Sequence, residues 1–206
     1  HYFARLFVGG DDGQRVHKNG ARTETIRQNL HTQDPQSKDL ALGRNFRNNY
    51  ETYRFARQFI PRTNLNVWDP NILERLHHDN RHGEMPTVVT YHHDSHRDAH
   101  LQMVLNNAEG NVAILCPLGP APGHVGRSGE SVEEVHNLLT SMNIQASKYH
   151  HQSEVPSPLQ QRLVTTFISA KGMEFDVVVI PRINFFKRIP EEWYVACTRA
   201  RRKLII

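Results

Sequence analysis

Short runs of apolar residues alternate along the chain with stretches of helical spacing. The apolar runs predict buried strands at residues 5–10, 87–91, 111–118, 163–167, 176–181 and 203–206. Helices are expected from Asn48 or Asn49 to about Phe59, over 95–106, from Ser131 onwards, and over about 190–200. Because helices separate strands that are mostly continuous apolar runs, the pattern predicts an α/β fold with a parallel sheet covered on both faces.

Local signals predict where several of these elements end. Pro61 is expected to stop the first of the helices, since proline cannot continue a helix. Ser131 and Glu134 have the spacing of a capping box at the start of an amphipathic helix. Glycines and prolines predict a loop over 119–130, and the polar stretch 28–38 has the composition of a linker. The linker marks the expected domain boundary.

The composition is that of an ordinary globular protein. The chain has 206 residues, of which 38% are hydrophobic and 22% are charged, and this balance excludes an intrinsically disordered chain. No apolar run approaches the ~20 residues that span a bilayer, so we expect no membrane partner. The first residues lack the features of a signal peptide and an initiator Met, so we expect a piece of a longer cytoplasmic protein.

The cysteines and the net charge exclude only a few classes of protein. Cys116 and Cys197 lie in apolar surroundings, and two isolated thiols form neither a disulfide framework nor a zinc site. We expect both to be buried. The net charge of +4 and the pI near 9.2 are compatible with a polyanionic partner.

Four segments carry polar residues in patterns that suit phosphate chemistry. Their sequences are VGGDDGQRVHKNGA at 8–21, LGRNFRNNY at 42–50, VTTFISAKGMEFDVVVI at 164–180 and YVACTRA at 194–200. In this order they resemble motifs III, IV, V and VI of the superfamily 1A DNA helicases of the UvrD/Rep type. The resemblance extends over nearly the whole chain, although 62–160 supports it through the fold pattern only. It implies a RecA-like (P-loop NTPase-type) three-layer fold.

The resemblance also implies roles in a composite ATP site. Transfer of a phosphoryl group requires positive charge and hydrogen-bond donors directed at the γ-phosphate. Arg199 corresponds to the arginine finger, while Arg47 and Gln14 correspond to residues that contact or sense the γ-phosphate. Glu174 and Gly172 correspond to positions beside the nucleotide, and a glycine suits a turn that approaches a ligand closely.

A second group of residues corresponds to the track for single-stranded DNA. These residues are His17, Lys18, Thr166, Ser169 and Lys171. His17 stands where the family usually has an aromatic residue, and Ile168 replaces the usual motif V histidine. Base stacking on an aromatic ring contributes about 1–3 kcal/mol per base, so we expect the loss of this aromatic residue to weaken translocation along the strand. The implied partner is single-stranded DNA, or DNA with a single-stranded tail.

Two essential parts of an ATPase are missing from the sequence. It contains no phosphate-binding loop of the Walker A type and no acidic pair for Mg²⁺. In the family these parts lie on a first RecA-like domain, which would hold most of the ATP and Mg²⁺. We therefore expect 1–28 to be the tail of that domain, 29–38 a linker, and 39–206 the second (2A-like) domain, without the large 2B insertion. Such a fragment would not hydrolyse ATP alone.

Two other functions fit parts of the sequence. The chain could be a non-catalytic nucleic-acid-binding or regulatory module that retains the helicase fold. The alternatives for the two arginines are a solvated basic helix end for Arg199 and a surface salt-bridge partner for Arg47. Alternatively, His92, His96 and His100 recur every four residues, which on one helix would place all three on one face as potential metal ligands.

Overall fold

A computed structural model describes residues 23–33, 47–117, 131–150, 160–181 and 190–206. Helix α1 (Thr23–Gln33) precedes the first of the four longer ranges. It includes residues 29–33 of the predicted linker, so this part of the linker is helical, and residues 34–38 lie outside the described residues. The division into two domains remains a prediction.

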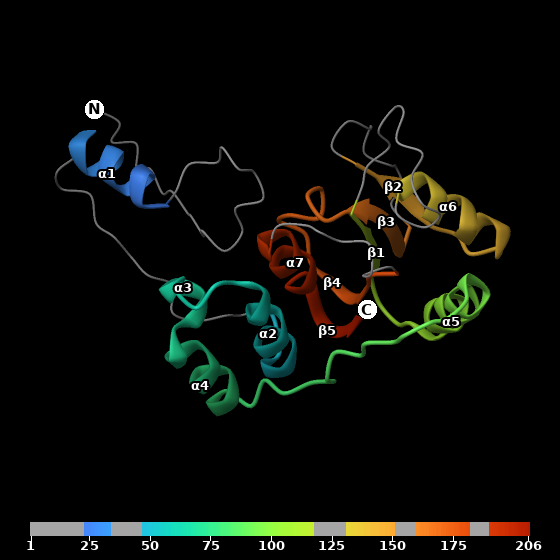
Figure 1. Cartoon of the computed structure of the whole chain (residues 1–206), viewed down its shortest axis with the longest axis horizontal. Helices are drawn as coiled ribbons and strands as arrows, with labels where there is room; N and C mark the ends of the chain where they lie inside the picture. The colour runs from blue at the N-terminus through green and yellow to red at the C-terminus, as the bar shows by residue number, and fades with distance from the viewer. Residues whose placement is uncertain (1–22, 34–46, 118–130, 151–159, 182–189) are drawn as a thin grey trace, which may run out of the picture.

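A five-stranded sheet forms the centre of the main body (Figure 1). Its strands lie in the order β2-β3-β1-β4-β5, and every neighbouring pair is parallel. They are β1 (Val112–Cys116), β2 (Ser147–Tyr149), β3 (Arg162–Thr166), β4 (Phe175–Val179) and β5 (Ala200–Ile205). All five amino ends therefore lie along one edge of the sheet, and all five carboxyl ends lie along the other.

Helices cover both faces of the sheet. One face carries α5 (Asp94–Asn107) and α6 (Val132–Ser141). The other carries α2 (Tyr50–Ala56), the 3-10 helix η2 (Arg57–Phe59), α3 (Leu65–Trp68), α4 (Pro70–His78) and α7 (Pro190–Cys197). The structure thus confirms the predicted three-layer α/β fold of the RecA-like type.

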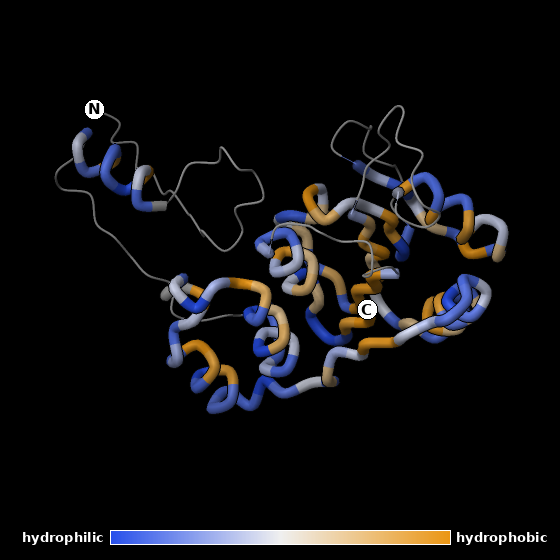
Figure 2. The backbone as a smooth tube through the Cα atoms, in the orientation of Figure 1, coloured by the Kyte–Doolittle hydropathy of each residue, from blue (hydrophilic) through white to orange (hydrophobic). Residues whose placement is uncertain are grey.

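Successive residues of each strand pack into opposite layers, as the pleat of a strand requires. On β1, Ala113 and Leu115 belong to the core beneath α2 and α7, whereas Ile114 belongs to the core beneath α5 and α6. Both cores are apolar, which explains the continuous apolar runs in the sequence. Figure 2 shows these hydrophobic strands at the centre and hydrophilic residues on the outer surfaces of the helices.

Most predicted elements are present, with small shifts at their ends. Asn49 caps α2 by accepting a hydrogen bond from the Thr52 N–H, and the helical segment ends at Phe59 before Pro61. The capping box of Ser131 and Glu134 is confirmed. None of the helices in the described ranges is long and apolar enough to cross a membrane.

Residues 87–91 do not form the predicted strand. Only Thr87 makes a bridge, to Ile205 of the edge strand β5, and Val88 is 57% exposed. A β-branched run needs a buried face to become a strand, and here none of the five residues is buried. The sequence analysis also missed the short elements β2, α3 and α4.

The two cysteines are buried, as predicted. Cys116 lies on β1 and Cys197 at the end of α7, and both thiols are free. Burial raises the pKa of each thiol far above its ordinary value. They behave as small apolar side chains of the two cores.

The start of α2 is packed against the segment that follows α4. The Tyr50 N–H donates to the Arg81 carbonyl at 2.7 Å, and the Gly83 N–H donates to Glu51 Oε2 at 2.8 Å. A Cβ atom at Gly83 would lie only 2.1 Å from Nδ2 of Asn49, which caps α2. This site therefore accepts glycine and little else.

We expect Gly83→Ala to destabilise the chain by about 1–3 kcal/mol, because the added methyl group displaces the Asn49 side chain. In the background of Asn49→Ser, which keeps a capping oxygen and removes the clashing amide, the same change should cost much less. Urea unfolding of the four proteins of this cycle measures the coupling. Strictly additive effects would contradict the proposed contact.

Candidate functional site

Three of the predicted ATP-site residues meet at the amino ends of β4 and β5. Glu174 immediately precedes β4, and Arg199 immediately precedes its parallel neighbour β5. Arg47 Nε donates to Glu174 Oε1 at 2.9 Å, and Arg199 Nη1 donates to the Met173 carbonyl at 3.3 Å. Two guanidinium groups from distant parts of the sequence therefore lie on either side of one short segment.

A buried asparagine holds this arrangement together. Asn48 Nδ2 donates to the carbonyl oxygens of Thr198 at 3.0 Å and of Ala200 at 2.7 Å, which flank Arg199. Asn48 is 1% exposed, so water does not compete for these bonds. The sequence analysis considered Asn48 only as a possible helix cap and missed this role. The pair of adjacent asparagines before α2 was the available signal.

The Arg199 side chain is fully buried. Its Nε donates to the Val195 carbonyl at 2.9 Å, and its Nη2 donates to Thr198 Oγ1 at 3.1 Å. These bonds compensate in part for removing the charge from water. An exposed cation at a helix end, which was the alternative for Arg199, is therefore wrong. To contact a nucleotide, the guanidinium would have to break these hydrogen bonds and form new ones to the phosphate.

The charges around Glu174 keep its carboxyl group ionised. The hydrogen bond from Arg47 is the main cause of its lowered pKa, burial opposes it, and the positive charges of Arg47, Arg201 and Arg199 add to the lowering. Both partners are partly accessible, with 26% of the Arg47 side chain and 43% of the Glu174 side chain exposed. One carboxylate thus lies among three guanidinium groups, and the site carries net positive charge suited to phosphate.

The motif V segment extends from one edge of the sheet to the other. Thr166 is the last residue of β3, and its Oγ1 accepts a hydrogen bond from the Ser169 N–H at 3.0 Å and donates to Ser169 Oγ at 2.9 Å. Lys171 is exposed, and Gly172 has a φ of 87°, a conformation that favours glycine. The structure therefore separates Thr166 and Ser169 from the Glu174 cluster.

Gln14, His17 and Lys18 lie outside the described residues. Their predicted contacts with the γ-phosphate and with DNA remain predictions.

The row of histidines does not have the expected geometry. Helix α5 begins at Asp94, so His92 precedes it and shares no helix face with His96 and His100. His96 packs against the His93 ring, and His100 Nδ1 is hydrogen-bonded to the Tyr91 hydroxyl. Within the described ranges, no three metal-ligating side chains lie close enough to hold an ion. The single-face prediction was wrong because the helix starts two residues later than that spacing needs.

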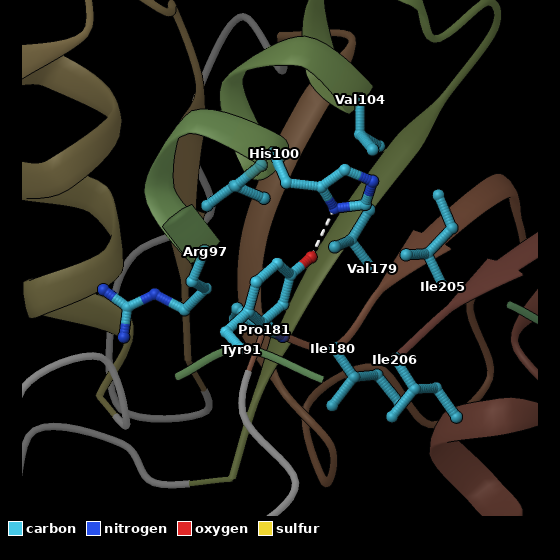
Figure 3. A pocket seen from close by; sticks show the side chains of 10 residues that line it. Tyr91, Arg97, His100, Val104, Val179, Ile180, Pro181, Ile205 and Ile206 are labelled. Atoms are coloured by element: carbon cyan, nitrogen blue, oxygen red, sulfur yellow. Dashed lines mark hydrogen bonds between the residues drawn. The ribbon is translucent and has the colours of Figure 1, made fainter. Parts of the chain in front are cut away.

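A small pocket lies beside this His100–Tyr91 pair (Figure 3). Its walls include Val179 to Pro181 at the end of β4 and Ile205 to Ile206 at the end of β5, so it lies at the carboxyl ends of these strands. Figure 3 shows the His100 ring directed at the Tyr91 hydroxyl and the Arg97 guanidinium turned away from them. The pocket is mostly apolar and lies at the opposite end of the strands from Glu174 and Arg199. It is not part of the candidate ATP site.

Comparison with known proteins gives a family. Residues 77–206, more than half of the chain, match the viral superfamily 1 RNA helicase core domain. A structural match is the C-terminal domain of a possible DNA helicase from Lactobacillus plantarum WCFS1, at 18% identity and a TM-score of 0.49, covering 78% of this chain and 86% of that one. This likeness carries no conclusion on function. No curated protein matches. The chain belongs to the family of the viral superfamily 1 RNA helicase core domain.

Proposed function

We propose that this chain is the C-terminal motor domain of an ATP-dependent helicase or translocase. It would contribute Arg47, Glu174 and Arg199 to a composite ATP site, whose phosphate loop and Mg²⁺ ligands lie on a preceding RecA-like domain. The observation that supports this most directly is the meeting of Arg47 and Arg199 around Met173 and Glu174 at one edge of the sheet. The four motifs imply a UvrD/Rep-type branch, and this finer assignment is part of the proposal.

The chemistry of these side chains fits a triphosphate. A guanidinium group offers a planar set of N–H donors that matches phosphate oxygens. Arg47 is partly exposed, so a phosphate can approach it directly and compete with the Glu174 carboxylate. We assign the Mg²⁺ ligands to the preceding domain, as the motif resemblance implies.

Arg199 is the residue whose role demands a change of conformation. Its guanidinium would act as the arginine finger only after leaving the carbonyls of Val195 and Met173. Arg199 lies two residues after the end of α7, so a movement of that helix end would shift the backbone that carries its side chain. Closure of the preceding domain over ATP would supply the free energy for this exchange.

Single-stranded nucleic acid is the proposed second substrate. Thr166, Ser169 and Lys171 would contact it at the carboxyl edge of β3, together with His17 and Lys18 beyond the described residues. The matching family is one of RNA helicases, whereas the motif resemblance implies DNA. Stimulation of ATPase activity by single-stranded RNA and by single-stranded DNA, measured in parallel, decides between them.

A non-catalytic module with the same fold is the alternative function. The full burial of Arg199 favours it, because a buried guanidinium bonded to backbone carbonyls also serves simply to secure α7. If the chain is a helicase motor domain, loss of the Arg199 side chain lowers ATP turnover. If it is a non-catalytic module, this loss leaves activity unchanged.

We expect Arg199→Ala to lower ATP turnover by ~10³-fold or more, with much less damage to nucleotide binding, because a finger acts chiefly on the transition state. The measurement uses the polypeptide that includes the preceding domain, saturated with single-stranded nucleic acid. Arg202→Ala, which removes an exposed arginine of β5 that is not among the charges acting on Glu174, is the matched control and should retain turnover.

Thermal unfolding of both variants separates chemistry from folding. Near-wild-type turnover in a folded Arg199→Ala protein would exclude the finger role. The chain of 206 residues alone should show no ATPase activity, since it lacks a phosphate loop.

A third variant tests the Arg47–Glu174 pair through pH. Because the pKa of Glu174 is lowered from its ordinary value of 4.5, the ion pair stabilises the folded chain above that pH and is lost as the pH falls through the folded-state pKa. We therefore expect wild type to melt at a higher temperature than Glu174→Gln near neutral pH, with a difference that vanishes in acid. Circular dichroism melting curves over this pH range test it, and a difference independent of pH would contradict the ion pair.

A further inference from the structure

Two arginines outside the helicase motifs lie over one tryptophan ring. The guanidinium carbon of Arg57 is 4.5 Å from the centre of the Trp68 ring, and that of Arg62 is 5.3 Å away. Trp68 Nε1 donates to the Ile60 carbonyl at 2.9 Å, which fixes the orientation of the indole. The ring therefore serves as a support for two cations.

Neither arginine is neutralised within the part of the chain that the structure describes. In the described ranges no carboxylate pairs with Arg57 or Arg62, and the Nε of Arg57 is buried without a hydrogen-bond partner. Other cations on this chain do have acidic partners, such as Lys148 with Glu133 and Lys203 with Glu84. Burial and the nearby charges of Arg54 and Arg62 lower the pKa of Arg57, while Tyr53 and Tyr50 oppose this. The patch thus concentrates positive charge.

This geometry leaves hydrogen-bond donors available to a ligand. A guanidinium group that lies against an aromatic ring keeps its N–H donors in its own plane. The Nε of Arg57 is buried, so its terminal nitrogens and those of the exposed Arg62 are the donors that a ligand would meet. Two like charges over one ring repel each other, and an anion with several acceptor oxygens relieves that repulsion. Phosphate groups have this chemistry.

The position of the patch connects it with the proposed strand track. Phe59, two residues after Arg57, stacks on Trp193 with ring centres 5.6 Å apart. Trp193 in turn contacts Phe167 at 5.3 Å, and Phe167 follows Thr166 directly. Trp193 is the fourth residue of α7, and Arg199 lies beyond the other end of that helix. These ring contacts link the segment that carries Arg57 to the residue that follows β3.

We propose that Arg57, Arg62 and Trp68 form an additional contact for the phosphate backbone of single-stranded nucleic acid. Repeated phosphates along one strand would reach both this patch and the turn after β3. The proposal extends the substrate class of the proposed function and rests on it for the choice of ligand. It requires no nucleotide, so binding measured without ATP tests it separately from Arg199.

The experiment measures binding of fluorescein-labelled oligouridylate and oligothymidylate to the whole chain by anisotropy, over a series of KCl concentrations. The test variant is Arg57→Gln with Arg62→Gln, which keeps both polar side chains and removes two charges. We expect the slope of log K against log salt to decrease in magnitude by about 1.4, and affinity at 0.1 M salt to fall on the order of 25-fold.

The matched control is Lys148→Gln with Lys203→Gln, which removes two exposed cations that the protein already pairs. It should leave the slope close to that of wild type. Equal slopes for wild type and the arginine variant would overturn the proposal, and so would equal losses in the arginine and lysine variants. Thermal unfolding confirms that each variant is folded.

Two competitors identify the ligand. Inorganic phosphate at matched ionic strength should not displace the oligonucleotide, because one phosphate engages only part of the patch. Displacement by free phosphate would overturn the assignment to a strand. Two results together would assign the patch to an acidic protein surface instead. Polyglutamate would displace the oligonucleotide from wild type but not from the arginine variant, and the salt slope of oligonucleotide binding would be unchanged in that variant.

Discussion

The two hydrogen bonds from the Asn48 amide to the carbonyls of Thr198 and Ala200 hold the functional edge of this protein together. They join the start of α2 to the turn between α7 and β5, and they are buried, so breaking them would leave polar groups without partners. Arg47 precedes this asparagine and Arg199 lies between the two carbonyls. The relative position of the two guanidinium groups therefore depends on one side chain that carries no charge.

The parallel sheet supplies the second constraint. Because all strands run the same way, residues that precede strands gather at one edge and residues that follow strands gather at the other. Glu174 and Arg199 belong to the first edge, and Thr166 to the second. The turn of 167–174 passes between the two edges. In the proposed function, the motif V sequence would therefore contact a nucleotide at one end of this connection and a strand at the other.

The arginines of the two regions differ in whether a carboxylate of the described residues pairs with them. Arg47 is held by Glu174, so a phosphate at that edge has to compete with a carboxylate. Arg57 and Arg62 instead lie against the Trp68 ring, and no carboxylate within the described ranges compensates their charge. A site where the ligand competes with a carboxylate suits a ligand that binds and leaves in each cycle. A patch whose positive charge is uncompensated suits continuous contact with a polyanion.

The sequence by itself determined the α/β class, the capped helices and the order of motifs that led to the helicase family. These features depend on residues close together in the chain, such as the apolar runs of β1 and β4, the Asn49 cap, and Ser131 with Glu134. Such signals act within one turn or one strand, and periodicity records them directly.

Tertiary structure alone decided the burial of Arg199, the failure of 87–91 to become a strand, and the grouping of Arg57 and Arg62 over Trp68. Each of these depends on what packs against the residue from elsewhere in the chain. Arg47 and Glu174 are 127 positions apart, and no local pattern records which carboxylate a guanidinium will meet. That choice is made only when the strands and helices pack, because packing fixes which surfaces lose contact with water.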